Sequence, residues 1–237
     1  FRFTGFIVLH NIIVLLSAHS SGPLLGLVIG LGSLAIWRFR QHMRKLRWAM
    51  VFALVALHLV MKAPVWFIMA RLSDVVGGGG FHRAELIDIF INSFSSWWLV
   101  GMNAIDTAKW FPYALAIEVG GGADITNQFV ADGIRAGLIG LFLSIRLFVR
   151  CFQSIGRSLR ESEDPVAERI AWGFGAILTC SVAIQFSVTY FDQMYVVGFF
   201  IMACICTISR EGTDWAFKDE VMILPVEPDQ SALSSQE

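Results

Sequence analysis

The sequence predicts an all-α membrane protein: a polytopic transmembrane helical bundle of about six spans, with one long extracytoplasmic loop that contains an amphipathic helix. Composition is the first observation behind this prediction. Hydrophobic residues make up 56% of the 237 residues and charged residues only 16%, whereas average soluble domains carry about 25% charge. The other two observations are apolar runs of membrane-spanning length and basic residues confined to particular segments between them.

The candidate spans are apolar runs at about 3–17, 22–37, 48–70, 128–150, 170–190 and 195–209. A transmembrane helix needs about 20 residues, so the second and sixth runs are short. The chain begins with Phe1 and enters the first run with little polar lead-in and no recognisable signal-peptide cleavage site. We therefore expect that an N-terminal part with further spans precedes this sequence.

Basic residues set the expected orientation of these spans. The segments between spans two and three and between spans four and five are rich in them; they contain Arg38, Arg40, Arg44, Lys45 and Arg47, and Arg150, Arg157, Arg160 and Arg169. The long segment 71–127 contains only Arg71, Arg83 and Lys109. Simple alternation then places both basic segments in the cytoplasm and the long segment outside it.

This orientation divides the chain into four parts. Residues 1–70 hold three N-terminal spans with the basic cytoplasmic loop 38–47, and residues 71–127 form the long extracytoplasmic loop. Residues 128–210 hold three C-terminal spans. The cytoplasmic tail 211–237 is polar and expected to be partly disordered.

The long loop contains a helical pattern from Glu85 to Val100, with a broad apolar face and polar residues opposite it. Two tryptophans, Trp97 and Trp98, lie near its end. We expect this amphipathic helix to lie on the outer membrane–water boundary, where tryptophan side chains are enriched.

Arg83 is the first candidate binding residue. It follows the run Gly77 to Gly80 and precedes the amphipathic helix. Backbone amides at a helix start favour an anion, and a guanidinium binds phosphate through two parallel hydrogen bonds, so a phosphate or pyrophosphate site is one interpretation. The other is an interfacial arginine that meets lipid headgroups or pairs with Asp88 or Glu118.

Two histidines on the same side are candidate bases. His82 adjoins Arg83, and His19 lies in the short outer turn 17–22. Either imidazole would suit general-base chemistry or phosphate binding. An interfacial His82 and a solvated His19 are the alternatives.

Further polar residues precede or begin the fourth span. Asp124 or Thr126 would cap its helix, and Asp132 and Arg135 share one face of its first turns. Lys62, in the third span, is either functional or extends to the outer surface.

Several classes of function receive no support from the sequence. No GxGxxG, P-loop or HExxH motif is present, and no acidic pair of the kind that holds a metal on a nucleotide sugar. The four cysteines lie in or beside apolar runs and are predicted to be membrane-buried thiols. We expect no metal and no cofactor, and the net charge of −1 gives no reason to expect a nucleic-acid partner.

Three stretches between Ser17 and Phe152 resemble the bacterial O-antigen ligase and O-antigen polymerase family. The first is the glycine-rich lead to Arg83, followed by Trp98-Leu99-Val100-Gly101. In the second, Thr126-Asn127, Phe129 and Gly137-Leu138-Ile139-Gly140 fit the spacing of the family's His-Asn pair, aromatic residue and Gly-Leu-Ile-Gly run. In the third, Ser20-Ser21-Gly22 occupies the place of a Ser-Arg-Gly turn.

The sequence departs from the family at two positions. Thr126 stands where the family has its catalytic histidine, and Ser21 where it has the arginine of the turn. Of the three positions tied to chemistry, Arg83 alone matches.

The resemblance implies transfer of a glycan from an undecaprenyl-pyrophosphate carrier to a sugar or lipid acceptor, at the outer face of the bacterial inner membrane. It implies Arg83 as the pyrophosphate clamp, Asn127 as an orienting residue beside Thr126, and His19 or His82 as a substitute base. Membrane lipid and the lipid-linked glycan would be the partners. The alternative is a non-catalytic protein of the same fold that binds lipid-linked sugar or serves assembly or transport. Neither the choice between ligase and polymerase nor the oligomeric state follows from the sequence.

Overall fold

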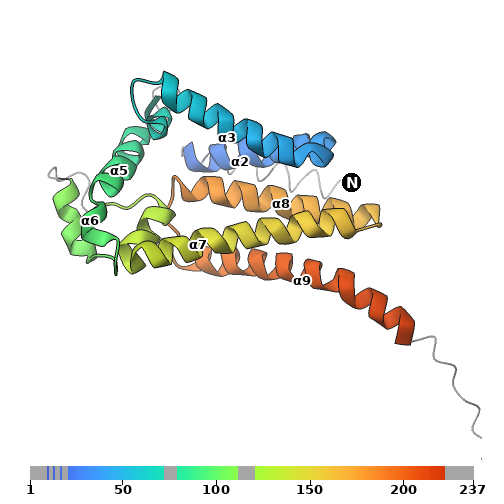
Figure 1. Ribbon diagram of the computed structural model, residues 1–237. Helices are drawn as coiled ribbons and strands as arrows, with labels where there is room; N and C mark the ends of the chain where they lie inside the picture. Colours follow the sequence, from blue (N-terminus) through green and yellow to red (C-terminus); the bar gives the residue numbers. More distant parts are fainter. Residues whose placement is uncertain are drawn as a thin grey trace, which may run out of the picture.

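The computed structural model describes residues 21–71, 79–111 and 121–221, together with residues 10, 13 and 17. These residues form helices and the loops that join them, as predicted for an all-α protein (Figure 1). In chain order the elements are α2 (Ser21–Ala35), η1 (Ile36–His42), α3 (Met43–Val60), η2 (Val65–Phe67), α5 (Gly80–Asn92), α6 (Phe94–Trp97), η3 (Ala104–Trp110), α7 (Gln128–Glu161), α8 (Pro165–Gln185) and α9 (Gln193–Val221).

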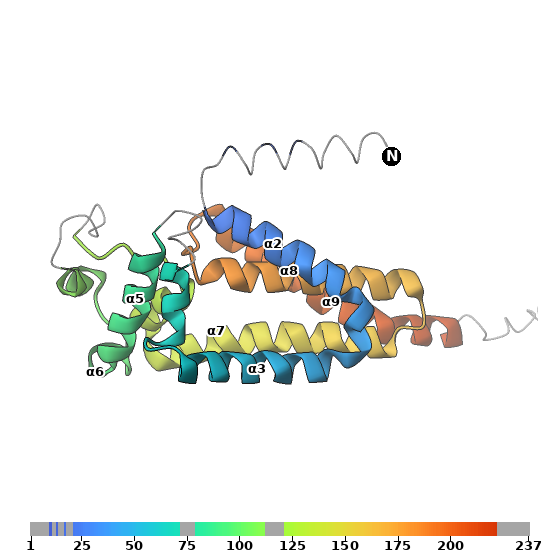
Figure 2. The same ribbon diagram turned by 90° about the horizontal axis from the view of Figure 1, so that it is seen from above.

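Four long helices, α2, α7, α8 and α9, lie lengthwise beside one another (Figures 1 and 2). Helix α8 packs on α2 and on α7, and α7 packs on α9. Buried side chains of α7, α8 and α9 form the core between these three helices; they are Phe148, Cys151, Ile155, Leu178 and Ile205. The four helices α2, α7, α8 and α9 are called the bundle below.

Two helices of the described chain, α7 and α8, are long and apolar enough to cross a membrane. The number rises to three if α3 and residues 65–71 are counted as one broken span, because the two pieces meet at an angle of 91°. The chain therefore has the helices of a membrane protein, although the six predicted spans are not all present as long apolar helices. The first predicted span lies almost wholly outside the described residues.

The third predicted span, 48–70, was wrong as a continuous helix. Helix α3 ends at Val60, and the backbone of Met61 is extended, with φ −70° and ψ 139°. The physical reason is Pro64, which has no backbone N–H and disfavours helical geometry at the residue before it. The chain turns here into η2, and Lys62 lies at the turn rather than inside a span.

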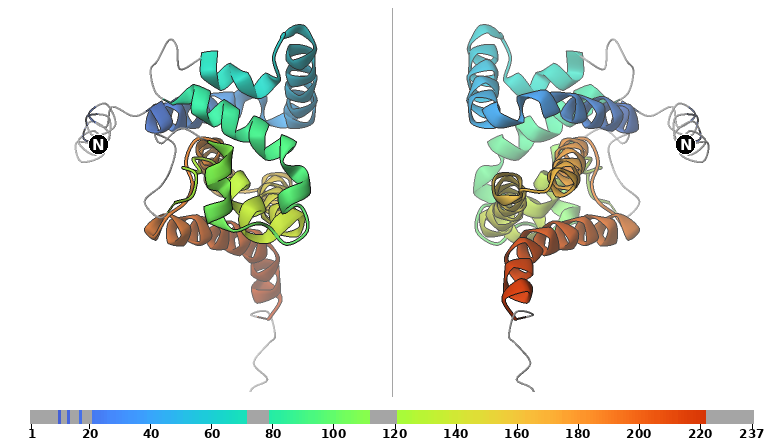
Figure 3. Two further views of the ribbon diagram at one scale, coloured as in Figure 1. Left: turned by 90° about the vertical axis from the view of Figure 1, so that its left-hand side faces the viewer. Right: turned by 90° about the vertical axis from the view of Figure 1, so that its right-hand side faces the viewer.

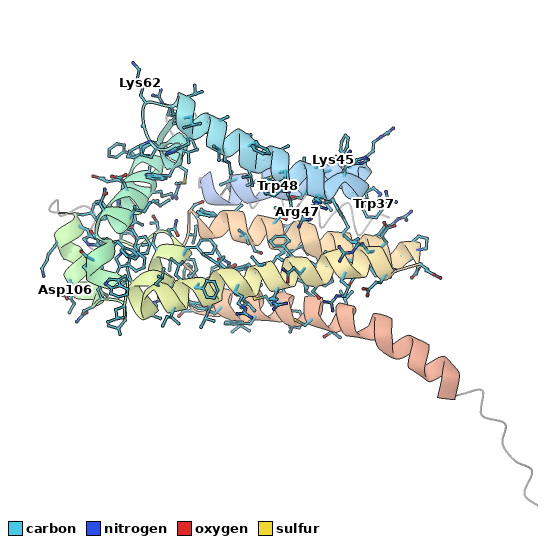
Figure 4. All side chains as sticks on the ribbon, in the orientation of Figure 1. Trp37, Lys45, Arg47, Trp48, Lys62 and Asp106 are labelled. Atoms are coloured by element: carbon cyan, nitrogen blue, oxygen red, sulfur yellow. The ribbon has the colours of Figure 1, made fainter. Side chains whose placement is uncertain are left out.

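The position of the basic segments distinguishes the two ends of the bundle. Figure 4 shows Lys45 near one end of α3 and Lys62 near the other, with Asp106 at the same end as Lys62. The basic segment around η1 is tied to the start of α8 by Arg40, whose Nε donates to Glu168 Oε1 at 2.6 Å. Both predicted basic segments therefore lie at one end of the bundle, and helices α5 and α6 lie across the opposite end (Figure 3).

Residues 79–111 and 121–136, called the end cap below, have a hydrophobic core of their own. Its buried side chains are Leu86, Phe90, Trp97, Phe111, Ala123, Val130 and Ile134. The rings of Phe90 and Trp97 stack with centroids 3.9 Å apart, and Trp97 Nε1 donates to Phe90 O at 2.8 Å. The segment is thus a folded unit and not a helix resting alone on a membrane surface.

The predicted amphipathic helix 85–100 is corrected in two respects. The helix begins earlier, at Gly80, and it is interrupted at Ser93 between α5 and α6. Trp97 is only 3% exposed and belongs to the core, whereas Trp98 is 45% exposed and retains the accessibility expected of a boundary residue. An internal carbonyl satisfies the indole N–H of Trp97, which permits its burial.

A kink in α7 joins the end cap to the bundle. Gly137 has φ 64° and ψ −161°, a combination that is essentially restricted to glycine. Leu138 N donates to Trp98 O at 2.8 Å and Met102 N donates to Ile134 O at 2.7 Å. The backbones approach so closely that a Cβ at Gly137 would lie 2.6 Å from Leu99 O.

Gly101 lies on the opposite side of this close approach between the two backbones. Its φ is 85°, and an added Cβ would collide with the backbone carbonyl of Ile134. The structure therefore brings together two glycines, Gly101 and Gly137, from separate stretches of the family resemblance.

Candidate functional site

Arg83 points from α5 toward the connection between α8 and α9. Its Nε donates to Ser187 O at 3.1 Å. Burial lowers the pKa of Arg83, and the nearby carboxylate of Asp124 partly offsets that effect. Because a guanidinium stays protonated in proteins, Arg83 is a half-buried cation at the end of the bundle opposite the basic segments.

His82 contacts a different segment from its neighbour Arg83. Its Nε2 donates to Asp124 O at 3.0 Å, and its ring lies 4.7 Å from the ring of Phe111. The imidazole is thus held against the wall of the end cap. The other predicted base, His19, lies outside the described residues.

Asn127 is the N-cap of α7. Its Oδ1 accepts from Val130 N at 3.1 Å, and its Nδ2 donates to Phe186 O at 3.3 Å. The prediction that Asp124 or Thr126 caps this helix was therefore wrong; an Asn at this position satisfies the same orphan N–H. The Thr126 hydroxyl is buried, with no hydrogen-bond partner among the described residues.

The connection 186–190 is held by side chains of the end cap and of the start of α7. The contacts are Arg83 Nε to Ser187 O, Asn127 Nδ2 to Phe186 O, Tyr190 N to Gln128 Oε1 at 2.7 Å, and Thr189 Oγ1 to Ile125 O. Arg83 and Asn127, two of the predicted substrate-binding residues, thus both hold the connection 186–190 in place. Together these contacts fix the position of Tyr190.

A cavity of about 330 Å³ lies next to this connection, between α7, α8 and α9. Its polar wall consists of Gln128, Asp132, Arg135, Gln185, Tyr190 and Tyr195. Farther along α7 and α9 the wall is almost entirely apolar, with Leu143, Leu147, Phe148, Phe199 and Met202. The cavity therefore changes from polar to apolar along the direction of the bundle.

Most polar groups of this wall are bonded to one another. Gln128 Nε2 donates to Asp132 Oδ1 at 2.7 Å, and Arg135 donates to the hydroxyl of Tyr195. The rings of Tyr190 and Tyr195 meet edge to face, with centroids 5.8 Å apart. Asp132 and Arg135 share the same face of α7, as predicted, but each has a different partner.

Gln185 differs from the other polar residues of the wall. Its side chain is 1% exposed, and neither its Nε2 nor its Oε1 has a hydrogen-bond partner among the described residues. An unpaired buried polar group costs about 1–3 kcal/mol, so the buried amide of Gln185 lowers the stability of this arrangement.

The cavity contains residues that sequence reasoning did not select. Gln185, Tyr190 and Tyr195 lie in or beside apolar runs. A single Gln near the end of an otherwise apolar helix is a recognisable signal, because polar side chains in such helices are costly. The two tyrosines carried no such signal, since tyrosine is common at membrane boundaries.

No family model matches the chain, and no curated protein is significantly similar to it. Among the described residues there is no group of His, Cys, Asp and Glu side chains that could hold a metal ion.

Proposed function

We propose that the chain is a multi-pass protein of the bacterial inner membrane that transfers a glycan from an undecaprenyl-pyrophosphate carrier to a sugar or lipid acceptor at the outer face. This is the activity implied by the resemblance to the O-antigen ligase and polymerase family. The observation that carries it is the cavity between α7, α8 and α9, polar near the end cap and apolar along the bundle.

An amphiphilic donor fits this gradient. Its polar head would lie beside Arg135 and Asp132, and its hydrocarbon chain beside apolar residues such as Leu147 and Phe199. A lipid-linked glycan has this division between a polar head and a long apolar tail. The polar wall of the cavity lies toward the end of the bundle away from the two basic segments, which alternation assigns to the cytoplasm.

The transfer needs positive charge at the leaving pyrophosphate and an acceptor for the proton of the attacking hydroxyl. Arg135 supplies a guanidinium in the cavity wall, and Asp132 supplies a carboxylate there. Arg83, bonded to Ser187, holds the connection that carries Tyr190 into the wall. In this proposal Arg83 positions the site while Arg135 meets the anion.

Transfer is tested with the full chain in proteoliposomes, supplied with an undecaprenyl-pyrophosphate-linked oligosaccharide and either a lipid or a sugar acceptor. Wild type should release the carrier and form the product. Arg135→Gln should lower the rate by about tenfold or more, because a charge-assisted bond to a phosphate is worth about 1.5–3 kcal/mol. The matched control is Arg157→Gln, on an exposed part of α7 near the opposite end.

No product from wild type with either acceptor would refute the transferase proposal. An unchanged rate in Arg135→Gln would refute the role of that arginine.

The second candidate function is binding of a lipid-linked sugar without turnover. The observation that favours it is the position of His82, whose Nε2 is engaged by Asp124 O; among the described residues, no histidine lines the cavity. This candidate predicts saturable binding of the same donor and no product under any condition. One turnover product that depends on the chain would exclude it.

The proposed orientation has its own test. In a chain with its four native cysteines replaced by alanine, a cysteine at Asp106 or Lys62 should react with a membrane-impermeant maleimide in intact cells. A cysteine at Lys45 should react only after lysis, because Lys45 lies at the other end of α3 (Figure 4). Labelling of Lys45→Cys in intact cells would reverse the orientation.

A further inference from the structure

The two basic segments of the chain differ in how their charges are balanced. The segment 150–169 carries four arginines and four acidic residues, whereas the described residues 21–71 contain no Asp or Glu. Arg40 is paired with Glu168, and no other Lys or Arg between residues 38 and 47 forms an ion pair within the described chain. The start of α3 is therefore a concentration of positive charge without a described counter-ion.

We propose that the first turns of α3 bind an anionic phospholipid. Its phosphate contacts Arg44 and Arg47, and its acyl chains lie along Trp48 and Phe52. This site is separate from the cavity between α7, α8 and α9, and it does not depend on glycan transfer.

The four side chains lie on one side of α3. Arg47 follows Arg44 by three residues and Trp48 follows it by four, which places them on the same helix face. The rings of Trp48 and Phe52 lie 5.9 Å apart, and Figure 4 shows Arg47 and Trp48 at the same end of α3. Both arginines are exposed, as are the two rings, at 56% for Trp48 and 66% for Phe52. This side of the helix thus passes from guanidinium groups to open apolar surface.

The order of these groups matches a phospholipid. A guanidinium binds a phosphate through two parallel hydrogen bonds, and tryptophan is enriched at the level where headgroups meet hydrocarbon. From Arg47 to the exposed Val55 the helix rises by about 12 Å, so an acyl chain has apolar surface to follow. A free phosphate would meet the arginines and leave this surface uncovered.

The segment before α3 is held by the protein itself. Arg40 lies 4.3 Å from the centre of the Trp37 ring, and the ring of Trp37 meets that of Trp172 in α8 edge to face, with centroids 5.5 Å apart. These contacts fix η1 against α8 and use Arg40 within the fold. They leave the guanidinium groups of Arg44 and Arg47 on the open side of α3.

Two lipids with the same acyl chains test the assignment: phosphatidylglycerol, which is anionic, and phosphatidylcholine, which is zwitterionic. The full chain in dodecyl maltoside is titrated with each lipid, and bound lipid is counted by native mass spectrometry. Wild type should bind phosphatidylglycerol more tightly, because the positive surface favours a ligand with net negative charge. This comparison requires no variant.

A double variant, Arg44→Gln with Arg47→Gln, then removes the proposed phosphate contacts. It should lower the affinity for phosphatidylglycerol by about tenfold or more, since each basic residue contributes to binding an anionic lipid. The matched control is Arg157→Gln with Arg160→Gln, which removes the same charge from exposed positions of α7 in the balanced segment. This control should bind phosphatidylglycerol as wild type does.

Inorganic phosphate separates a lipid site from a simple anion site. It should displace no more phosphatidylglycerol than sodium chloride of the same ionic strength, because it cannot cover Trp48 and Phe52. Greater displacement would overturn the assignment to a lipid. Equal affinity of wild type for the two lipids would also overturn it. Equal losses in the two double variants would do the same, because general charge attraction would then explain the binding.

Discussion

The end cap and α3 are both rich in apolar residues, yet they use them in opposite ways. In the end cap, Phe90 and Trp97 stack inside a core formed by side chains of the cap itself. In α3, no residue is buried against the described chain, and Phe52 is 66% exposed. Helix α3 makes its main described contacts with η1 and η2 at its two ends.

The difference shows that apolar content alone does not tell which solvent a segment meets. Water drives the end cap to bury its apolar side chains together. Lipid imposes no such penalty, so a helix inside a bilayer can keep apolar side chains on every face. Helix α3 has the surface of a helix surrounded by hydrocarbon or by protein outside the described residues.

The sharpest test of this contrast compares a phenylalanine from each region. Phe90→Ala should lower the free energy of unfolding by about 3–5 kcal/mol, the usual cost of removing a buried aromatic ring. Phe52→Ala should leave it within about 0.5 kcal/mol, as for exposed positions. Both are measured by unfolding of the purified chain in detergent micelles. A similar loss for the two variants would mean that α3 is packed in solution.

Substitution of a glycine at the contact between the end cap and α7 should give the next largest change in the free energy of unfolding. Gly137→Ala forces a side chain into a backbone geometry reserved for glycine and against Leu99 O. We expect a loss of about 2–4 kcal/mol from strain and overpacking together. Gly173→Ala, inside α8 with open space around its Cβ, should instead be neutral or stabilise by up to about 1 kcal/mol.

These two variants are compared by thermal unfolding under one detergent condition. If Gly137→Ala were as stable as Gly173→Ala, the close approach of Leu99 to α7 would not exist in solution.

A smaller effect is expected from the polar contact inside the cap core. Trp97→Phe keeps a ring of similar character but removes the N–H that donates to Phe90 O at 2.8 Å. The free energy of unfolding should fall by about 1 kcal/mol, the net contribution of one hydrogen bond. Trp98→Phe, at an exposed position of the same segment, is the matched control and should change the unfolding midpoint little.

The smallest change in the free energy of unfolding is expected at the basic end of the bundle. Arg40 bonds to Glu168 and lies 4.3 Å from the centre of the Trp37 ring. Because the pair is partly exposed, Arg40→Gln should cost about 1 kcal/mol or less, and salt should reduce that cost. Arg47→Gln, whose Nε contacts only a carbonyl of its own helix turn among the described residues, should cost less still. Equal costs at low and high salt would contradict the ionic origin.

Much of the fold was predictable because apolar runs and basic segments are local signals. The start of α7 and the placement of both basic segments at one end agree with the sequence, whereas α8 begins at Pro165, ahead of the predicted span 170–190. The break after α3 was also legible in Pro64, which the continuous prediction for 48–70 passed over. The burial of Trp97 depends on a core that includes the distant residues Val130 and Ile134, and no local pattern shows it.

The candidate site was less predictable than the fold. Arg83 and Asn127 were selected, and the structure places both at the connection that borders the cavity. Asp132 and Arg135 were correctly placed on one helix face, and both line the cavity. The burial of the Gln185 amide without a described partner depends on which helices meet, and the sequence alone does not show it.

The backbone bonds between residues 98–102 and the kink of α7 have a consequence for how the protein is made. Trp98 and Met102 leave the ribosome before their partners Leu138 and Ile134, so the end cap must wait for the next helix before these contacts can form. Throughout that interval its carbonyl and amide groups remain open to other partners. Substitutions at Gly101 should therefore reduce the yield of folded protein during biosynthesis more than they shorten the lifetime of molecules already assembled.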